Sequence, residues 1–168
     1  MFDLSKKSLT LSNVNGRHEK HGEEDVLAAD LKFSGDFSGD ILAEFHPTLR
    51  SAMFAKNEGG DLADQGSDVP TALRFKNLCW PLKFTNELIG AAVTLEYGLT
   101  EIVFDPAKVN DFKVECCDGG TVKVSFRVQV SGIGEESLAR CFMLLDTSVP
   151  VTIVPPEEKH SEDMKKAA

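Results

Sequence analysis

Residues 111–130 read DFKVECCDGGTVKVSFRVQV, two alternating runs on either side of Asp118-Gly119-Gly120. Apolar and polar residues alternate in both runs, which is the period of a strand with one buried face. The apolar positions are Phe112, Val114, Cys116, Val122, Val124, Phe126, Val128 and Val130. The stretch therefore predicts a β-hairpin.

The register of this hairpin follows from the length of its loop. A two-residue loop would set the apolar face of one strand against the polar face of the other, whereas a loop of residues 118–120 pairs even positions with even ones. We expect Gly120 to take the left-handed conformation that such a loop needs. The expected pairs are Val114 with Val124, Phe112 with Phe126, Glu115 with Lys123, and Asp111 with Arg127.

Composition limits the class of protein. The chain has 168 residues, of which 42% are hydrophobic, enough for one compact domain, expected over residues 1–156. Its 18 Lys and Arg against 27 Asp and Glu give a net charge of -9, which disfavours non-specific binding of nucleic acid. The first residues lack the apolar core of a signal peptide, and no apolar run reaches the roughly 20 residues of a membrane span. We expect a soluble, cytoplasmic protein.

The first part of the chain predicts a second hairpin. Leu9 and Leu11 alternate with polar residues and lead into a strand that ends or bulges over 13–16, and residues 26–33 alternate again. The charged residues 18–25 between them are expected to be a long exposed connection.

Helical and irregular segments follow. Residues 34–40 are turn-forming, and Asp40 is a suitable N-cap for a helix over 41–46. Pro47 should interrupt this helix, so that a second helical turn buries Leu49 and Met53. Residues 56–68 combine glycines with acidic residues and predict a flexible loop.

The remaining pattern favours a mainly-β fold. Short extended segments between Leu73 and Phe104 are separated by turns expected at Pro81, Asn86, Gly90, Gly98 and Asp105-Pro106. Residues 135–145 form a second short helical element, because Leu138, Cys141, Phe142 and Leu145 keep helical spacing. A strand over 149–153 and a disordered charged tail over 157–168 complete the chain. The prediction is an antiparallel sandwich or partly open barrel with two short helical elements.

No motif supplies catalytic chemistry. His18-Glu19-Lys20-His21 is one residue short of a His-Glu-x-x-His zinc motif and has no third ligand. Neither a phosphate-binding glycine loop nor a complete calcium loop occurs. The cysteines, Cys79, Cys116, Cys117 and Cys141, lack metal-site spacing, and Cys117, on a polar face, is the one candidate for a reactive thiol. We expect no metal, no cofactor and no enzyme activity.

An aromatic platform for single-stranded DNA is a minor hypothesis. Stacking could come from Phe75, Trp80, Phe84 and Tyr97, and charge from Arg74, Lys76 and Lys83. Alternation of apolar and polar positions in this region favours core packing instead.

Two blocks of the sequence resemble a known group of proteins. They are NVNGRHEKHGEEDVLAADLKF at 13–33, and GGTVKVSFRVQV at 119–130 followed by VTIVPPE at 151–157. They are similar to small early-region proteins of tailed bacteriophages and prophages, often encoded near recombination and replication genes. The resemblance implies a place in phage DNA metabolism inside a bacterial host cell, and it carries no catalytic motif.

Two functional hypotheses follow. The first is a non-catalytic accessory protein of phage DNA recombination or replication, acting through a protein partner or weak single-stranded DNA binding. Its functional surface is expected in the irregular segments 18–25 and 56–68, with partner-binding residues His18, Lys20, His21, Glu23, Glu24 and Asp25. The alternative is an inhibitor of a host nuclease or defence enzyme, whose acidic surface imitates nucleic acid.

Overall fold

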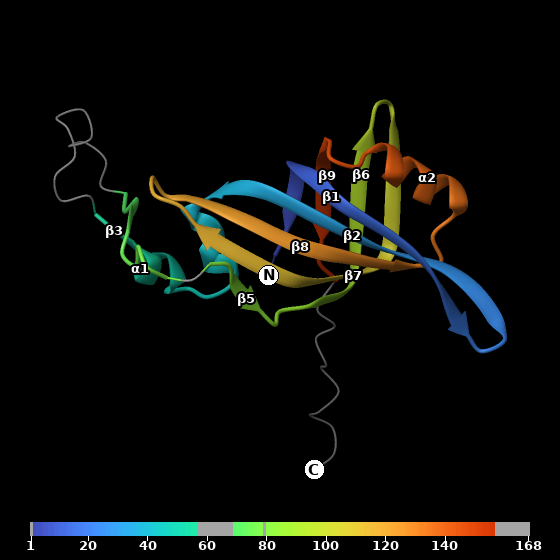
Figure 1. Ribbon diagram of the computed structural model, residues 1–168, viewed down its shortest axis with the longest axis horizontal. Coiled ribbons are helices and arrows are strands. Elements are labelled where there is room, and N and C mark those ends of the chain that lie inside the picture. The colour runs from blue at the N-terminus through green and yellow to red at the C-terminus, as the bar shows by residue number, and fades with distance from the viewer. Residues whose placement is uncertain (1, 57–68, 79, 157–168) are drawn as a thin grey trace, which may run out of the picture.

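The computed structural model describes residues 2–56, 69–78 and 80–156 (Figure 1). Most of them belong to one antiparallel sheet of seven strands. Its strands are β1 (Leu4–His21), β2 (Glu24–Ser38), β5 (Leu82–Phe84), β6 (Leu88–Tyr97), β7 (Thr100–Cys116), β8 (Thr121–Ser131) and β9 (Ser148–Val154). A separate small sheet pairs β3 (Phe54–Ala55) with β4 (Ala72–Leu73).

The seven-stranded sheet closes on itself. Its order is β5-β7-β6-β9-β1-β2-β8, and β8 pairs in addition with β7, so the strands from β7 to β8 form a ring. The ring is partly open, because β1 pairs with β9 only over Leu4–Thr10 while its pairing with β2 continues to His21. Closure pairs edges that would otherwise invite aggregation. The expected mainly-β antiparallel fold is confirmed, in its barrel form rather than as a sandwich.

The core lies on the inner face of the ring. Alternate residues of β8, and of β2 from Ala29 to Phe33, are buried there, as one-sided burial of a pleated strand requires. Phe112 and Phe126 face each other with ring centroids 5.8 Å apart, and Phe2 meets the edge of Phe112 at 5.0 Å. Burial of large aromatic side chains supplies much of the apolar area that holds such a core together.

The β7–β8 hairpin follows its predicted register near the turn. Val114 pairs with Val124 and Glu115 with Lys123, and Gly120 has a positive φ of 79°. The register changes between Asn110 and Lys113, so the predicted pair of Asp111 with Arg127 is wrong. Phe112 and Phe126 are not a ladder pair, but their buried rings are in contact inside the ring of strands, as expected. Asp111 takes a φ of 54°, which inserts a bulge and places Asn110 opposite Arg127.

The β1–β2 hairpin is longer than predicted. Residues 18–25 are not a loose connection, because pairing continues through Lys20 and Asp25 to a tight turn at Gly22. The strand neither ends nor bulges over 13–16 as expected: its register shift lies earlier, between Leu11 and Asn13, and residues 13–16 pair regularly with β2. Exposed ribbons of this kind carry polar residues on both faces, so the apolar alternation that marks a half-buried strand is missing.

Residues 34–38 are strand rather than turn. β2 continues to Ser38, which pairs with Thr121 of β8. Gly35 serves packing there, because a Cβ at this position would lie 2.4 Å from Leu9 Cδ2. The turn signal of the glycines was therefore misleading.

Two further predicted turns lie inside strands. β6 runs through Gly90 and β7 runs through Asp105 and Pro106. Both positions fall at register shifts of the β6–β7 pair. A bulge accommodates a proline that has no N–H to donate, which is why the strand is not interrupted. The turns expected at Gly98, Asn86 and Pro81 do lie outside strands.

The first helical element is split as predicted. The 3-10 helix η1 (Gly39–Glu44) and helix α1 (Leu49–Met53) flank Pro47, and Leu49 and Met53 pack against the core. Asp40 is not the N-cap, which is Ser38; it lies in the first turn of η1 and forms an ion pair with Arg50.

Helix α2 (Glu135–Met143) confirms the second helical element. It buries Cys141, and Leu138 packs against the core, as the spacing predicts. Phe142 and Leu145 were expected on the same buried face but are 49% and 38% exposed, whereas Leu144 is buried. The helix ends before Leu144, so helical spacing does not decide the orientation of the residues that follow.

Other sequence predictions fall outside the described residues. They concern the loop at 57–68, the tail at 157–168 and Cys79. In the parts of the chain that the structure covers, no helix is long and apolar enough to cross a membrane.

Candidate docking groove

A groove lies between the end of the β1–β2 hairpin and helix α2. Its volume is about 620 Å³. The hairpin contributes His18, Asp25 and Leu27, and the segment around α2 contributes Ile133, Gly134, Glu135, Leu138, Ala139 and Phe142. In Figure 1 the hairpin extends past the neighbouring strands on the side of the ring where α2 lies. We call this feature the docking groove.

The floor of the docking groove is apolar. Ile133 is buried, while Leu27 and Leu138 are partly buried and pack against the core. Phe142 forms the outer part of this surface and is 49% exposed. The half-exposed aromatic side chain, beside aliphatic side chains that are packed on the core, leaves part of this apolar surface in contact with water.

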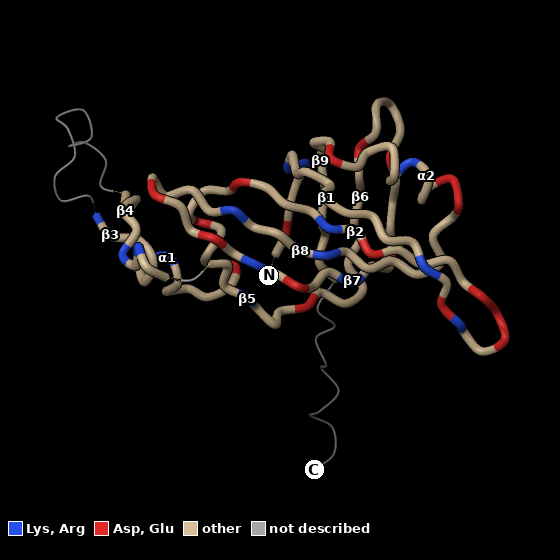
Figure 2. The backbone as a smooth tube through the Cα atoms, in the orientation of Figure 1, with Lys and Arg blue, Asp and Glu red and all other residues tan. Residues whose placement is uncertain are grey.

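The charged residues that line the groove, apart from His18, are acidic. Asp25 from β2 and Glu135 from α2 are both exposed, and Glu23 lies close to Asp25 at the hairpin turn. Within the described residues none of these three carboxylates forms an ion pair. Figure 2 shows the acidic stretch at the end of the hairpin. Lys20 of β1 pairs with Asp25 in the β1–β2 ladder.

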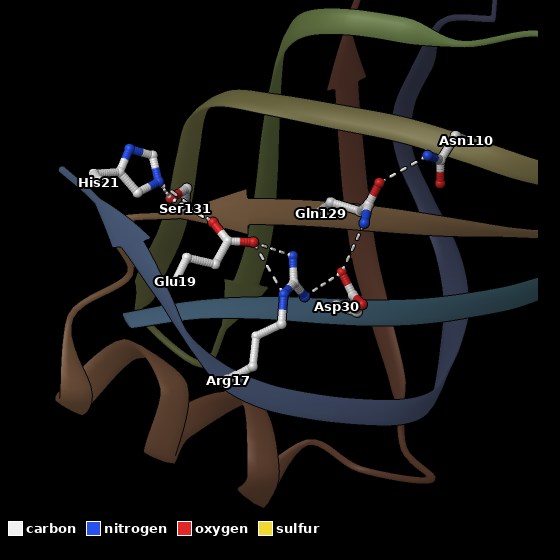
Figure 3. A network of polar contacts seen from close by, with 7 residues as sticks. All are labelled: Arg17, Glu19, His21, Asp30, Asn110, Gln129 and Ser131. Atoms are coloured by element: carbon white, nitrogen blue, oxygen red, sulfur yellow. Dashed lines mark hydrogen bonds and ion pairs between the residues drawn. The ribbon is translucent and has the colours of Figure 1, made fainter. Parts of the chain in front are cut away.

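A polar network fixes the hairpin over the groove (Figure 3). Arg17 Nη2 lies 2.6 Å from Glu19 Oε1, and Arg17 Nη1 lies 2.6 Å from Asp30 Oδ1. Ser131, at the end of β8, donates to Glu19 Oε2 at 3.0 Å. The hairpin extends beyond the end of β8, so these contacts hold a segment that backbone pairing with β8 no longer holds.

The network continues across the outer face of the ring. Gln129 Nε2 donates to Asp30 Oδ1 at 3.1 Å, Asn110 Nδ2 donates to Gln129 Oε1 at 2.8 Å, and Arg127 Nε donates to Asn110 Oδ1 at 3.1 Å. Asn110 is the buried polar side chain of the described residues, and both ends of its amide are bonded. The chain of contacts links the hairpin to β8 and β7.

Electrostatics within the network stabilise its charged forms. Hydrogen bonds from Arg17 and Ser131 lower the pKa of Glu19. The hydrogen bond to Asp30 raises the pKa of Arg17, with Glu19 adding to the effect. Both groups therefore stay charged at neutral pH.

A smaller hollow of about 320 Å³ lies on the network's own face of the hairpin. Arg17, Glu19 and Lys108 line it, but Arg17 is bound by Glu19 and Asp30, and Lys108 Nζ lies 2.9 Å from Glu87 Oε1. Its charges are already paired inside the protein. The carboxylates of the docking groove have no such partner within the described parts of the chain, so we take this groove as the candidate site.

The six predicted partner-binding residues divide between the two faces of the hairpin. His18, Lys20 and Asp25 share the groove face, since pairing sets Lys20 opposite Asp25 and His18 opposite Leu27. His21 and Glu24 pair on the opposite face, where His21 Nε2 lies 3.3 Å from Ser131 Oγ. Glu23 belongs to the turn.

Sequence reasoning missed the apolar half of the groove. Leu27, Ile133 and Leu138 were assigned to the core or left unassigned, and Phe142 was placed on a buried helix face. The spacing of Leu138 and Phe142 signals an apolar helix face, but no local pattern shows that part of it stays uncovered.

The predicted platform for single-stranded DNA is not assembled. Phe84 pairs with Phe112 and Tyr97 with Thr100, positions of β7 that lie 12 residues or about 40 Å apart along the strand. Trp80 packs against the core, which supports the core interpretation for it, whereas Phe75 is 52% exposed.

The charged members of the platform also have separate surroundings. Arg74 Nε donates to the carbonyl oxygen of Phe54 at 3.1 Å, and Lys83 pairs with Lys113 in the β5–β7 ladder. Lys76 is exposed in the segment between β4 and β5. A local patch of positive charge for single-stranded DNA would therefore have to combine Arg74, Lys76 and Lys83 from these separate segments.

The burial of the described cysteines agrees with the strand and helix faces on which the sequence places them. Cys116 and Cys141 are buried, and burial raises the pKa of each to about 11. Cys117 is partly exposed. Over residues 2–56, 69–78 and 80–156, no cluster of His, Cys, Asp and Glu could hold a metal ion.

Comparisons of the chain with protein-family models, curated proteins and solved structures find no match. The geometry of the docking groove and the sequence resemblance described above are therefore the basis for a functional proposal.

Proposed function

We propose that this protein is a non-catalytic binding protein that receives a protein partner in the docking groove. The observation that carries the proposal is the combination of Phe142, half exposed, with the unpaired carboxylates of Asp25 and Glu135 around one concave surface. Single exposed apolar side chains are common on monomeric proteins, but one that lies in a concave surface beside anchored aliphatic residues and unpaired carboxylates is typical of a binding site.

The resemblance to early-region phage proteins gives the proposal its biological setting. Proteins encoded beside recombination and replication genes often work as accessories of those processes. The partner is then a recombination or replication protein of a tailed phage, and the site of action is the cytoplasm of the bacterial host. This part of the proposal rests on the similarity of residues 13–33, 119–130 and 151–157.

Weak single-stranded DNA binding is a minor part of the proposal. Arg74, Lys76, Trp80 and Lys83 remain the residues that would contribute to it. A chain with a net charge of -9 can bind phosphate only through such a local patch, so binding should fall steeply with salt.

The direct test uses purified phage recombination and replication proteins in pull-down assays, with single-stranded DNA tested separately by gel shift. The full chain should retain a phage protein, and Phe142→Ala should weaken this retention while Met143→Ala leaves it unchanged, since Met143 is exposed on α2 but does not line the groove. Absence of binding to every phage protein and to DNA would refute the proposal.

Inhibition of a host nuclease or defence enzyme is the second candidate. One observation favours it: Glu23, Glu24 and Asp25 lie exposed together at the end of the projecting hairpin. An enzyme that binds nucleic acid could accept these carboxylates in place of phosphates. Charge reversal of all three residues should then abolish inhibition, and full inhibition by the reversed variant would exclude this role for them.

A further inference from the structure

We propose that the docking groove binds a basic amphipathic segment of its partner, with an apolar side chain against Leu27 and Phe142 and Lys or Arg beside Asp25 and Glu135. The inference rests on the proposed function and names the chemistry of the partner that the groove accepts. It commits to a peptide segment of a protein rather than to nucleic acid or a second copy of this chain.

The apolar half of the segment follows from the floor of the groove. Leu27 and Leu138 are already packed on the core, so they lose little side-chain freedom when a partner covers them. Phe142 adds a rigid aromatic surface that is 49% exposed. Phe is enriched at protein interfaces, so Phe142 offers a suitable contact for an apolar anchor residue of the partner.

The basic half follows from the rim. Asp25 and Glu135 enter from opposite walls of the groove, one on the hairpin and one on α2, so a segment lying in the groove has a carboxylate on each side. Neither carboxylate has an ion-pair partner among the described residues. Complementary charges at a rim raise the association rate and select against acidic partners.

The same charges exclude the other occupants. Phosphates of a nucleic acid would meet Asp25, Glu135 and the hairpin turn with Glu23, and they would be repelled. A second copy of a chain with a net charge of -9 would bring its own excess of acidic residues. A basic peptide segment is the occupant that fits both the floor and the rim.

The test is a titration of the full chain with fluorescent peptides of about 16 residues, long enough for an amphipathic helix with four apolar anchors. The first peptide carries Leu at helical spacing with Lys on the remaining face. The second has the same apolar residues with Glu in place of Lys, and the third has the first peptide's composition in scrambled order. Anisotropy gives the affinities, and amide chemical shifts of the labelled protein locate the site.

Variants separate the floor from the rim. Phe142→Ala should weaken the basic peptide about tenfold, and Met143→Ala, its matched control on the same helix, should not change it. Asp25→Lys should weaken it by about tenfold at low salt, whereas Asp3→Lys, the same charge change away from the groove, should have little effect.

A gain of affinity gives the sharpest check. Lys20 is exposed on the groove face opposite Asp25 and opposes a basic ligand. Lys20→Glu should tighten binding of the basic peptide about threefold at low salt, and this gain in affinity should shrink at high salt. A loss of folding cannot imitate a gain of binding.

Each outcome decides the inference. Preference for the basic peptide, with shifts at Leu27, Ile133 and Phe142 and the expected variant effects, supports it. Preference for the acidic peptide, equal binding of the scrambled one, binding insensitive to Phe142→Ala, self-association that Phe142→Ala abolishes, or no peptide binding would each overturn it. If phage proteins are retained in the pull-down while no peptide binds, the proposed function stands and only this inference fails.

Discussion

Gly16 lies directly beneath Leu138: a Cβ at position 16 would be 3.0 Å from Leu138 Cδ2. This close approach packs helix α2 against the groove face of the β1–β2 hairpin. The docking groove lies next to this contact, between α2 and the end of the hairpin. The glycine therefore sets the spacing of the groove as well as the packing of the helix.

Adding volume at Gly16 should push α2 away from the hairpin. Gly16→Ala should cost little because the end of the Leu138 side chain can move, and Gly16→Val should cost about 1–3 kcal/mol of unfolding free energy. Denaturant unfolding measures the difference. Asn15→Val, which places the same Val side chain at the exposed neighbouring position, is the control and should be close to neutral. Equal stability of Gly16→Val and the wild type would contradict the packing.

Removal of Arg17 should loosen the hairpin without unfolding the barrel. Arg17→Ala removes the contacts of Glu19 and Asp30 with Arg17, and it should cost about 1 kcal/mol, chiefly through Asp30, whose side chain is 19% exposed. Amide hydrogen exchange should quicken over residues 18–27 and stay slow in β6 and β9. Lys20→Ala removes an exposed Lys from the same hairpin and should change neither the unfolding free energy nor the exchange rates. If exchange over residues 18–27 stays as slow in Arg17→Ala as in the wild type, the network does not hold the hairpin.

Glu19 gives the stability of the hairpin a dependence on pH. Its pKa lies below the ordinary value of 4.5, chiefly because Arg17 and Ser131 donate to the carboxylate, so its contribution is fully present above that value. The contribution is lost as the pH falls through the lowered pKa. We expect Glu19→Gln to be less stable than the wild type at neutral pH, with the gap closing below about pH 4.5. A gap that stays constant from neutral to acid pH would contradict the assignment.

Thiol reactivity should single out Cys117. Burial raises the pKa of Cys116 and Cys141 to about 11, so at about pH 8 only about one in a thousand of these thiols is ionised. In a Cys79→Ala background, one thiol per folded chain should react quickly with a thiol reagent, and Cys117→Ser should remove that fast phase. Rapid reaction of Cys141 would mean that α2 does not bury this side chain in the core.

The sequence predicted the parts of the fold that repeat locally. Residues 121–130 alternate without interruption, so the strand, its inner face and the pair of Val114 with Val124 could be derived. The bulge at Asp111 could not, because Asp takes the left-handed conformation more often than most residues but no local pattern shows which Asp of a strand does so. Gly35 is a similar case, since its reason is contact with Leu9 of another strand.

The sequence predicted the charged residues of the candidate site but not its apolar residues. His18 and Asp25 were chosen as exposed charged residues, and both line the docking groove. Phe142 was missed because it lies more than a hundred residues from the hairpin in sequence, and only the closed ring brings the two together. The extension of β1 and β2 to their turn was missed because a ribbon that is exposed on both faces has no hydrophobic period.

The most direct test of the central claim is the affinity of the basic amphipathic peptide for Phe142→Ala relative to Met143→Ala. Both variants shorten an exposed side chain of α2, and only Phe142 lines the docking groove. A dissociation constant about tenfold higher for Phe142→Ala than for Met143→Ala is the predicted result. Equal dissociation constants for the two variants would contradict the claim that the groove is the docking site.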